Sequence, residues 1–150
     1  YWGHRGPMHH LTPGLRLVYS RHTRQHHRFF THERWALDGL RDLRAVLFPP
    51  VLMTFFIAAV MLPAGLFLAW IATPNVGWLF VATSLAYFLN YEFLHLSYHL
   101  PPGHPIARWG LVRRLERLHR AHHDPRLMAH RNFNITYPIC DALFGTLQRR

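Results

Sequence analysis

The chain of 150 residues contains no lysine and a single cysteine, Cys140. One cysteine excludes an internal disulfide and a cysteine-rich zinc site, and we expect Cys140 to be a small buried residue. All 17 basic residues are therefore arginines, set against 7 acidic residues, and the formal net charge is +10. Such a balance suits nucleic acid or an anionic membrane surface. No helix-turn-helix or zinc-finger spacing is present, so we expect no nucleic-acid partner.

Charge is also missing from the middle of the chain. Residues 46–72 carry no charged side chain, and this run is longer than the roughly 20 residues that cross a bilayer core. After a turn at Thr73-Pro74-Asn75 a second apolar run follows, in which Glu92 is the only acid. We predict membrane spans at about 46–72 and 76–96, joined by the short turn as an antiparallel hairpin. The alternative, a buried hairpin of a soluble protein, is disfavoured by uncharged runs of this length.

The arginines set the expected orientation. Arg41 and Arg44 precede the first span, the arginines of residues 108–120 follow the second, and the turn carries no charge. By the positive-inside rule both flanks lie in the cytoplasm. We therefore expect an all-α, multi-pass integral membrane protein whose hairpin carries a cytosolic, helical, histidine-rich cap. Residues 1–150 form one domain in this interpretation. Because the chain opens on Tyr1 without an initiator methionine, we expect a further membrane segment upstream.

Histidine, by contrast, is abundant: the chain has 14, and ten of them fall into four clusters. The clusters are His4 and His9; His22, His26 and His27; His95 and His99; and His119, His122 and His123. Histidine is the commonest metal ligand among side chains. Residues at i and i+4 share a helix face, as His95 and His99 do. Residues five apart lie about 140° apart on an ideal α-helix, so the first two clusters require either a distorted segment or rings that diverge.

The clusters predict a shared metal site on the cytosolic side of the membrane. Imidazole binds zinc, copper, iron and nickel alike, so the ligand type leaves the metal open. Glu116 lies one turn before His119 and could orient its ring. His10, His32 and His104 fall outside the clusters, and we expect no metal role for them.

Two other functions fit parts of this pattern. A membrane metal-binding or transport protein could use the histidines as a zinc site, but ion pathways need ionisable residues within the spans, and Glu92 is the only acid there. An interfacial anchor whose basic flanks bind anionic lipid would explain the arginines and the hairpin. It leaves the histidine spacing unexplained.

In sequence order the clusters read H-x(3–4)-H, H-x(2–3)-HH, H-x3-H and H-x(2–3)-HH. This order resembles the histidine boxes of the fatty acid hydroxylase/sterol desaturase superfamily of integral-membrane di-iron enzymes. The tail, with Asn132-Phe133-Asn134 and then Asp141 to Thr146, also resembles the ending of that family. Asn134 stands where the family has glycine, and the second box has the longer spacer. The resemblance covers nearly the whole chain.

The resemblance implies two iron ions, with zinc as a possible substitute, held by all ten clustered histidines. It implies supporting roles around the ligands for Glu92, Glu116, Asn132 and Asp141, of which Asp141 is expected to serve the fold; His130 is a further candidate. No side chain is assigned as a catalytic acid or base. The implied activity is an O2-dependent oxidoreductase of lipid biosynthesis that hydroxylates or desaturates a fatty acyl, sterol or carotenoid lipid.

The resemblance also implies a source of electrons outside the chain. No flavin or nucleotide fingerprint is present in the sequence. We therefore expect a separate donor, cytochrome b5-like or ferredoxin-like by analogy with the family.

Overall fold

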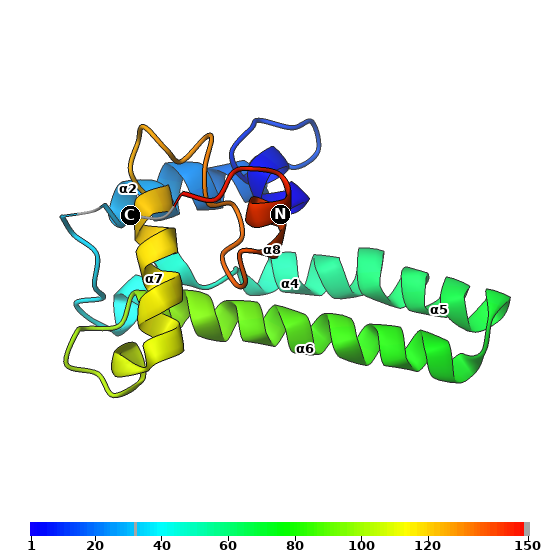
Figure 1. The fold of residues 1–150 in the computed structure, drawn as a ribbon. Coiled ribbons are helices and arrows are strands. Elements are labelled where there is room, and N and C mark those ends of the chain that lie inside the picture. The colour runs from blue at the N-terminus through cyan, green and yellow to red at the C-terminus, as the bar shows by residue number, and fades with distance from the viewer. Residues whose placement is uncertain (32, 149–150) are drawn as a thin grey trace. The chain divides into compact units, whose positions relative to one another are not determined.

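A computed structural model describes residues 1–31 and 33–148, which form helices and turns and no strand (Figure 1). The all-α prediction is confirmed. In chain order the elements are η1 His4–Met8, α1 Arg16–Tyr19, η2 Ser20–His26, α2 His27–Phe29, η3 Leu40–Asp42, α3 Leu43–Val46, α4 Pro50–Phe56, η4 Ile57–Met61, α5 Leu62–Ile71, α6 Pro74–Tyr98, η5 Ile106–Arg108, α7 Gly110–His122 and α8 Ile139–Leu143. The chain divides into two compact units: unit 1 comprises Tyr1–Leu47 and Leu94–Arg150, and unit 2 comprises Phe48–Phe93.

Unit 2 consists of two helical arms that run side by side (Figure 1). Elements α4, η4 and α5 form one arm, and α6 as far as Phe93 forms the other. The arms approach closely at two glycines: a Cβ added at Gly77 would lie 2.4 Å from the carbonyl oxygen of Gly65. Only glycine permits so close an approach of two backbones. At the other end of the unit, the Phe48 ring packs edge-on against Phe88, with ring centroids 6.1 Å apart.

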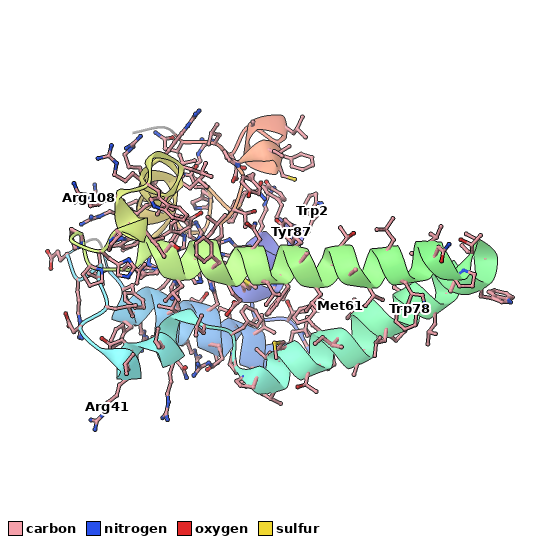
Figure 2. The ribbon with its side chains drawn as sticks, turned by 90° about the horizontal axis from the view of Figure 1, so that it is seen from below. Trp2, Arg41, Met61, Trp78, Tyr87 and Arg108 are labelled. Carbon is pink, nitrogen blue, oxygen red and sulfur yellow. The ribbon has the colours of Figure 1, made fainter. Side chains whose placement is uncertain are left out.

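The surface of unit 2 is apolar. Large side chains such as Leu66, Trp70 and Trp78 are 69%, 81% and 69% exposed, and Figure 2 shows few nitrogen or oxygen atoms along the arms. One helical stretch in the described part of the chain, Leu40–Ile71, is long and apolar enough to cross a membrane, and 11% of its most apolar window is buried. So little burial argues against a core helix of a soluble protein. α6 does not reach the same hydropathy, so the second predicted span stays a prediction.

Unit 1 is built around its histidines. The largest fully buried side chains are Tyr98, Phe30, Phe133, His99, His119 and His122. α7 turns one face to this core, because Val112, Leu115 and His119 repeat at helical spacing and are buried, whereas Arg113 and Arg117 on the opposite face are exposed. Cys140, which was predicted to be buried, is only half-buried on α8.

Candidate metal centre

The ten clustered histidines are all buried in unit 1, and nine of them form two groups whose ligand nitrogens lie within 4.8 Å of one another. The first group consists of His4, His9, His22, His27 and His122. The second group consists of His26, His99, His119 and His123. His95 adjoins the second group, since its Nε2 lies 3.1 Å from Nε2 of His26. The four sequence clusters therefore meet.

The first two clusters converge because their backbone is π-helical. In a π-helix the hydrogen bonds run over five residues, so residues five apart come onto one face. η2 shows this directly: the His27 N–H donates to the His22 carbonyl, and the two Nε2 atoms lie 3.1 Å apart. His4 opens η1 and His9 follows its last residue, with their Nε2 atoms 3.1 Å apart. The sequence allowed a distorted segment here, and the structure contains one.

The third and fourth clusters use ordinary α-helical spacing. His95 and His99 are one turn apart on α6, and His119 and His123 are one turn apart at the end of α7. The His95 and His119 ring centroids are 4.9 Å apart, so the two helices present their histidines to the same point.

Adjacent histidines within a cluster join different groups. His26 belongs to the second group and His27 to the first; likewise His123 belongs to the second and His122 to the first. Neighbouring residues on a helix point in different directions, so each His-His pair can reach two centres. The groups also touch, because the His27 and His123 rings stack with centroids 4.1 Å apart. The geometry therefore provides two adjoining centres.

Backbone carbonyls orient the rings. A carbonyl can only accept, so each of these contacts fixes the proton on Nδ1 and leaves a lone pair on Nε2. Five rings donate Nδ1–H in this way: His4 to Phe133 O, His26 to Ala45 O, His99 to Trp35 O, His122 to Arg131 O and His123 to Phe30 O, at 2.5–2.9 Å.

This tautomer pattern fits bound metal. His26 and His123 both donate through Nδ1, yet their Nε2 atoms face each other at 3.0 Å. Two lone pairs at that distance repel each other unless a cation lies beside both. Two nitrogens about 2.1 Å from one ion and at right angles to each other would lie about 3.0 Å apart. The Nε2 distance between His9 and His122, 2.9 Å, agrees with the same geometry in the first group.

Several buried ring nitrogens also have no hydrogen-bond partner within the described residues. They include Nε2 of His99 and both ring nitrogens of His119. Buried polar atoms are normally paired, and an orphaned atom calls for an explanation such as an ion. The donor set therefore fits metal at both groups.

Burial and mutual repulsion keep the imidazoles neutral. Desolvation, with a contribution from His122, lowers the pKa of His9 from 6.5 to about 3. Desolvation likewise lowers the pKa of His99 to about 4, although the Trp35 carbonyl opposes the shift. For His26 desolvation and the nearby His99 lower the pKa well below its ordinary value. Neutral imidazole is the form that binds metal, so the groups are ready to bind at neutral pH.

These shifts predict that acid destabilises the protein stripped of metal by a chelator. A folded-state pKa below the unfolded value of 6.5 means that the unfolded chain binds more protons at intermediate pH. The stabilisation is complete above pH 6.5 and is lost as the pH falls through the pKa of about 4 of His99 and His122. We expect the free energy of unfolding in detergent to fall by more than about 1.4 kcal/mol per pH unit in this window, since several histidines titrate together. A flat profile between pH 6.5 and 4, measured by near-UV circular dichroism, would contradict these shifts.

Asp141 and Asn132 support the centre through the backbone. The fully buried Asp141 carboxylate accepts hydrogen bonds from the Phe133 N–H at 2.9 Å, the Asn134 N–H at 2.7 Å and the Thr146 hydroxyl at 2.6 Å. Asn132 has a positive φ of 55°, and its side-chain amide donates to the Leu118 carbonyl at 3.1 Å. Residues 131–133 are thereby fixed, and their carbonyls hold two histidine rings. The fold-supporting role predicted for Asp141 agrees with these contacts.

The supporting roles predicted for Glu92, Glu116 and His130 stay predictions. Glu92 belongs to unit 2, where it accepts the Phe48 N–H at 3.0 Å. Glu116 lies 3.8 Å from Arg120 and lines a cavity, so the orienting role predicted for it stays a prediction. His130 is exposed and is in neither histidine group.

The histidines without a predicted metal role also lie outside both groups. His10 is exposed and His104 is half-buried. His32 lies outside the described residues.

Sequence reasoning missed the residues that orient the rings. Ala45, Arg131 and Phe30 act through backbone carbonyls, which leave no signal in residue type. Trp35 was also missed, although its ring lies 4.4 Å from that of His99, centroid to centroid. The one hint in the sequence was the position of this aromatic residue, between the second and third histidine clusters.

Comparison with known proteins agrees with this centre. The sequence model of the fatty acid hydroxylase family matches residues 1–146, a range that includes all four histidine clusters. None of the curated proteins and none of the solved structures compared with the chain matches it. The family match extends over nearly the whole chain, and the chain therefore belongs to the fatty acid hydroxylase family.

Proposed function

We propose that this chain is a di-iron, O2-dependent oxidoreductase that hydroxylates or desaturates a lipid at the cytosolic face of a membrane. Membership of the family makes it a membrane-associated oxidoreductase with a metal cofactor. The observation that carries the proposal is the pair of adjoining histidine groups, in which Nε2 lone pairs face each other with no proton available between them. The five histidines of the first group exceed the four ligands that zinc takes in structural sites, which favours iron.

The protein's own contribution would be to hold the iron, to orient the histidine rings and to shield the centre from water. Iron at the two groups would supply the activation of O2 needed to attack an unactivated C–H bond. The carbonyls of Phe133, Arg131 and Phe30 fix the orientations of three rings, so these ligands are held in place before metal binds. His99 and His122 are fully buried, and water is thereby kept from the reacting centre.

The proposed partners follow from the chemistry. The substrate is a lipid, namely a fatty acyl lipid, a sterol or a carotenoid. The co-substrate is O2. Electrons come from a separate cytochrome b5-like or ferredoxin-like protein. The arginine-rich flanks support a cytosolic centre on a multi-pass membrane protein, by the positive-inside rule.

The test is reconstitution. The protein is purified in detergent, loaded with iron, and supplied with O2, a soluble cytochrome b5 or ferredoxin with its reductase, and membrane lipids. We expect about two irons per chain and new hydroxyl groups or double bonds in the lipids by mass spectrometry. Tight binding of zinc in place of iron, with no lipid product under any donor, would instead favour the metal-binding or transport protein.

A further inference from the structure

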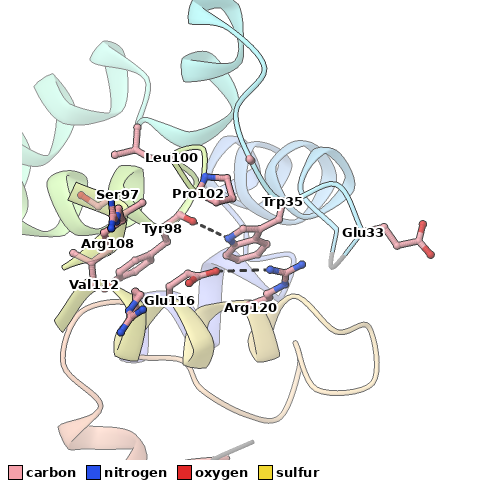
Figure 3. Close-up of a pocket in the computed structure, with 13 residues that line it drawn as sticks. Glu33, Trp35, Ser97, Tyr98, Leu100, Pro102, Arg108, Val112, Glu116 and Arg120 are labelled. Carbon is pink, nitrogen blue, oxygen red and sulfur yellow. Dashed lines mark hydrogen bonds and ion pairs between the residues drawn. The ribbon is translucent and has the colours of Figure 1, made fainter. Parts of the chain in front are cut away.

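A cavity of about 550 Å³ lies in unit 1 beside the second histidine group, between α7 and the segment that follows α6. Trp35, Tyr98 and Val112, which line it (Figure 3), are buried. None of the described residues that line it is a histidine. The cavity therefore ends one side chain short of the metal centre.

Two aromatic side chains that line the cavity separate it from the second group: Trp35, and Tyr98, whose ring centroid lies 5.5 Å from that of His119. Trp35 makes the wider contact. Its ring centroid lies 4.4 Å from that of His99, 5.0 Å from His123 and 5.5 Å from His119, so one indole contacts three rings of the second group. The indole N–H donates to the Tyr98 carbonyl at 2.7 Å, which fixes the ring in place (Figure 3). Anything that enters the cavity meets an aromatic ring already in contact with the ligands.

The aromatic side chains between the cavity and the ligands limit what can pass from the cavity to the metal. A C–H bond must reach the metal itself to react, and Trp35 stands between the cavity and the ligands. An electron needs no such contact, because it passes between closely packed aromatic groups. The cavity thus suits the entry of electrons rather than of the lipid.

The rim of the cavity is positively charged. Arg108, Arg113 and Arg120 line it, against the acids Glu33 and Glu116. Arg120 lies 3.8 Å from Glu116 and 5.5 Å from the Trp35 ring centroid. Arg108 and Arg113 are exposed and take part in neither of the ion pairs found in the described residues.

The positive charge extends beyond the rim. Further arginines, Arg114 and Arg117, are exposed on the same helix as Arg113. Such a surface attracts a partner with clustered carboxylates and speeds its docking.

We propose that this arginine-rimmed cavity is the docking site of an acidic one-electron carrier protein, and that Trp35 connects the docked carrier to the second histidine group. The inference rests on the proposed function. Hydroxylation of one C–H bond by O2 takes up two electrons and two protons and releases one water, so a one-electron carrier docks twice in each turnover.

The test reverses two charges at the rim. The variant Arg108→Glu/Arg113→Glu is compared with Arg16→Glu/Arg126→Glu, which changes the net charge equally at exposed arginines outside the cavity. The probes are a soluble cytochrome b5 domain and a plant-type ferredoxin, both acidic. With the carrier that supports turnover, we expect the rim variant to raise the KM for the carrier at least about ten-fold and to flatten its salt dependence. The rim variant should be reduced by dithionite at the wild-type rate. The control variant should keep the wild-type KM for the carrier.

The outcomes separate the two proposals. A wild-type protein that turns over lipid while the rim variant keeps its KM for the carrier overturns the docking site alone. So does an effect that appears only in nanodiscs containing phosphatidylserine, which would make the rim a lipid-headgroup site. A wild-type protein that binds iron yet yields no product with any reductant overturns the proposed function.

A second variant tests the connection. Trp35→Leu should slow reduction by saturating carrier while the rate of dithionite reduction is retained, because a small reductant does not depend on the cavity. If reduction by the carrier and by dithionite slowed equally, or if neither rate changed, Trp35 would not be the connection between the carrier and the centre.

Discussion

Replacing His122 by alanine is expected to abolish lipid product and to remove iron from the first histidine group, while the protein still inserts into membranes. His122 is fully buried, its Nδ1–H is held by the Arg131 carbonyl at 2.8 Å, and its Nε2 lies 2.9 Å from that of His9. Loss of residues that merely orient a ligand costs about 10–100-fold in metal affinity, so loss of the ligand should cost at least about 100-fold in activity. Metal analysis and lipid mass spectrometry on purified protein measure both effects.

The matched control is His130→Ala. His130 follows His122 by eight positions but is exposed and lies in neither group. It should keep its iron and its activity. Unchanged iron content in His122→Ala would count against the ligand assignment, and equal loss in both variants would indicate a general effect of removing histidine.

Replacing Asp141 by asparagine is expected to be the most damaging change outside the ligands. Oδ1 of the carboxylate accepts from the Phe133 N–H and the Thr146 hydroxyl, and Oδ2 accepts from the Asn134 N–H. An amide offers one acceptor oxygen, and its NH2 group would face a donor. We expect a loss of about 3 kcal/mol in unfolding free energy, since a buried donor is left unpaired and charge-assisted bonds are lost. Thermal unfolding in detergent measures this loss.

The loss should extend to the metal, because the Phe133 carbonyl holds His4 at 2.5 Å. Asp38→Asn is the control: this carboxylate is 73% exposed and pairs with Arg34 at 3.1 Å. Exposed ion pairs contribute less than about 1 kcal/mol. Equal stability of the two variants would show that the 132–134 segment does not depend on Asp141.

Helical periodicity made part of the site predictable. His95 with His99, and His119 with His123, are four residues apart on α-helices. The structure brings His99, His119 and His123 into one group, and His95 adjoins it. The pattern could not say which of two adjacent histidines joins which group. That division depends on how the helices are rotated, which the spacing of one segment does not specify.

The π-helical turns could not be predicted from the sequence. His22 and His27 diverge on an α-helix and converge only because the His27 N–H bonds five residues back, and no residue preference marks such a turn in advance. The role of Glu116 is a different case. Its position one turn from His119 suggested a partner for that ring, and its carboxylate lies 3.8 Å from Arg120 and lines the cavity. The orienting role therefore stays a prediction.

Iron content combined with X-ray absorption at the iron edge tests the central claim most directly. The wild-type protein should bind about two irons per chain with nitrogen ligands near 2.1 Å. His9→Ala and His99→Ala, each of which removes a ligand from a different group, should each reduce this to about one iron. A single iron in the wild type, or the same two irons retained in both variants, would contradict a centre built from two histidine groups.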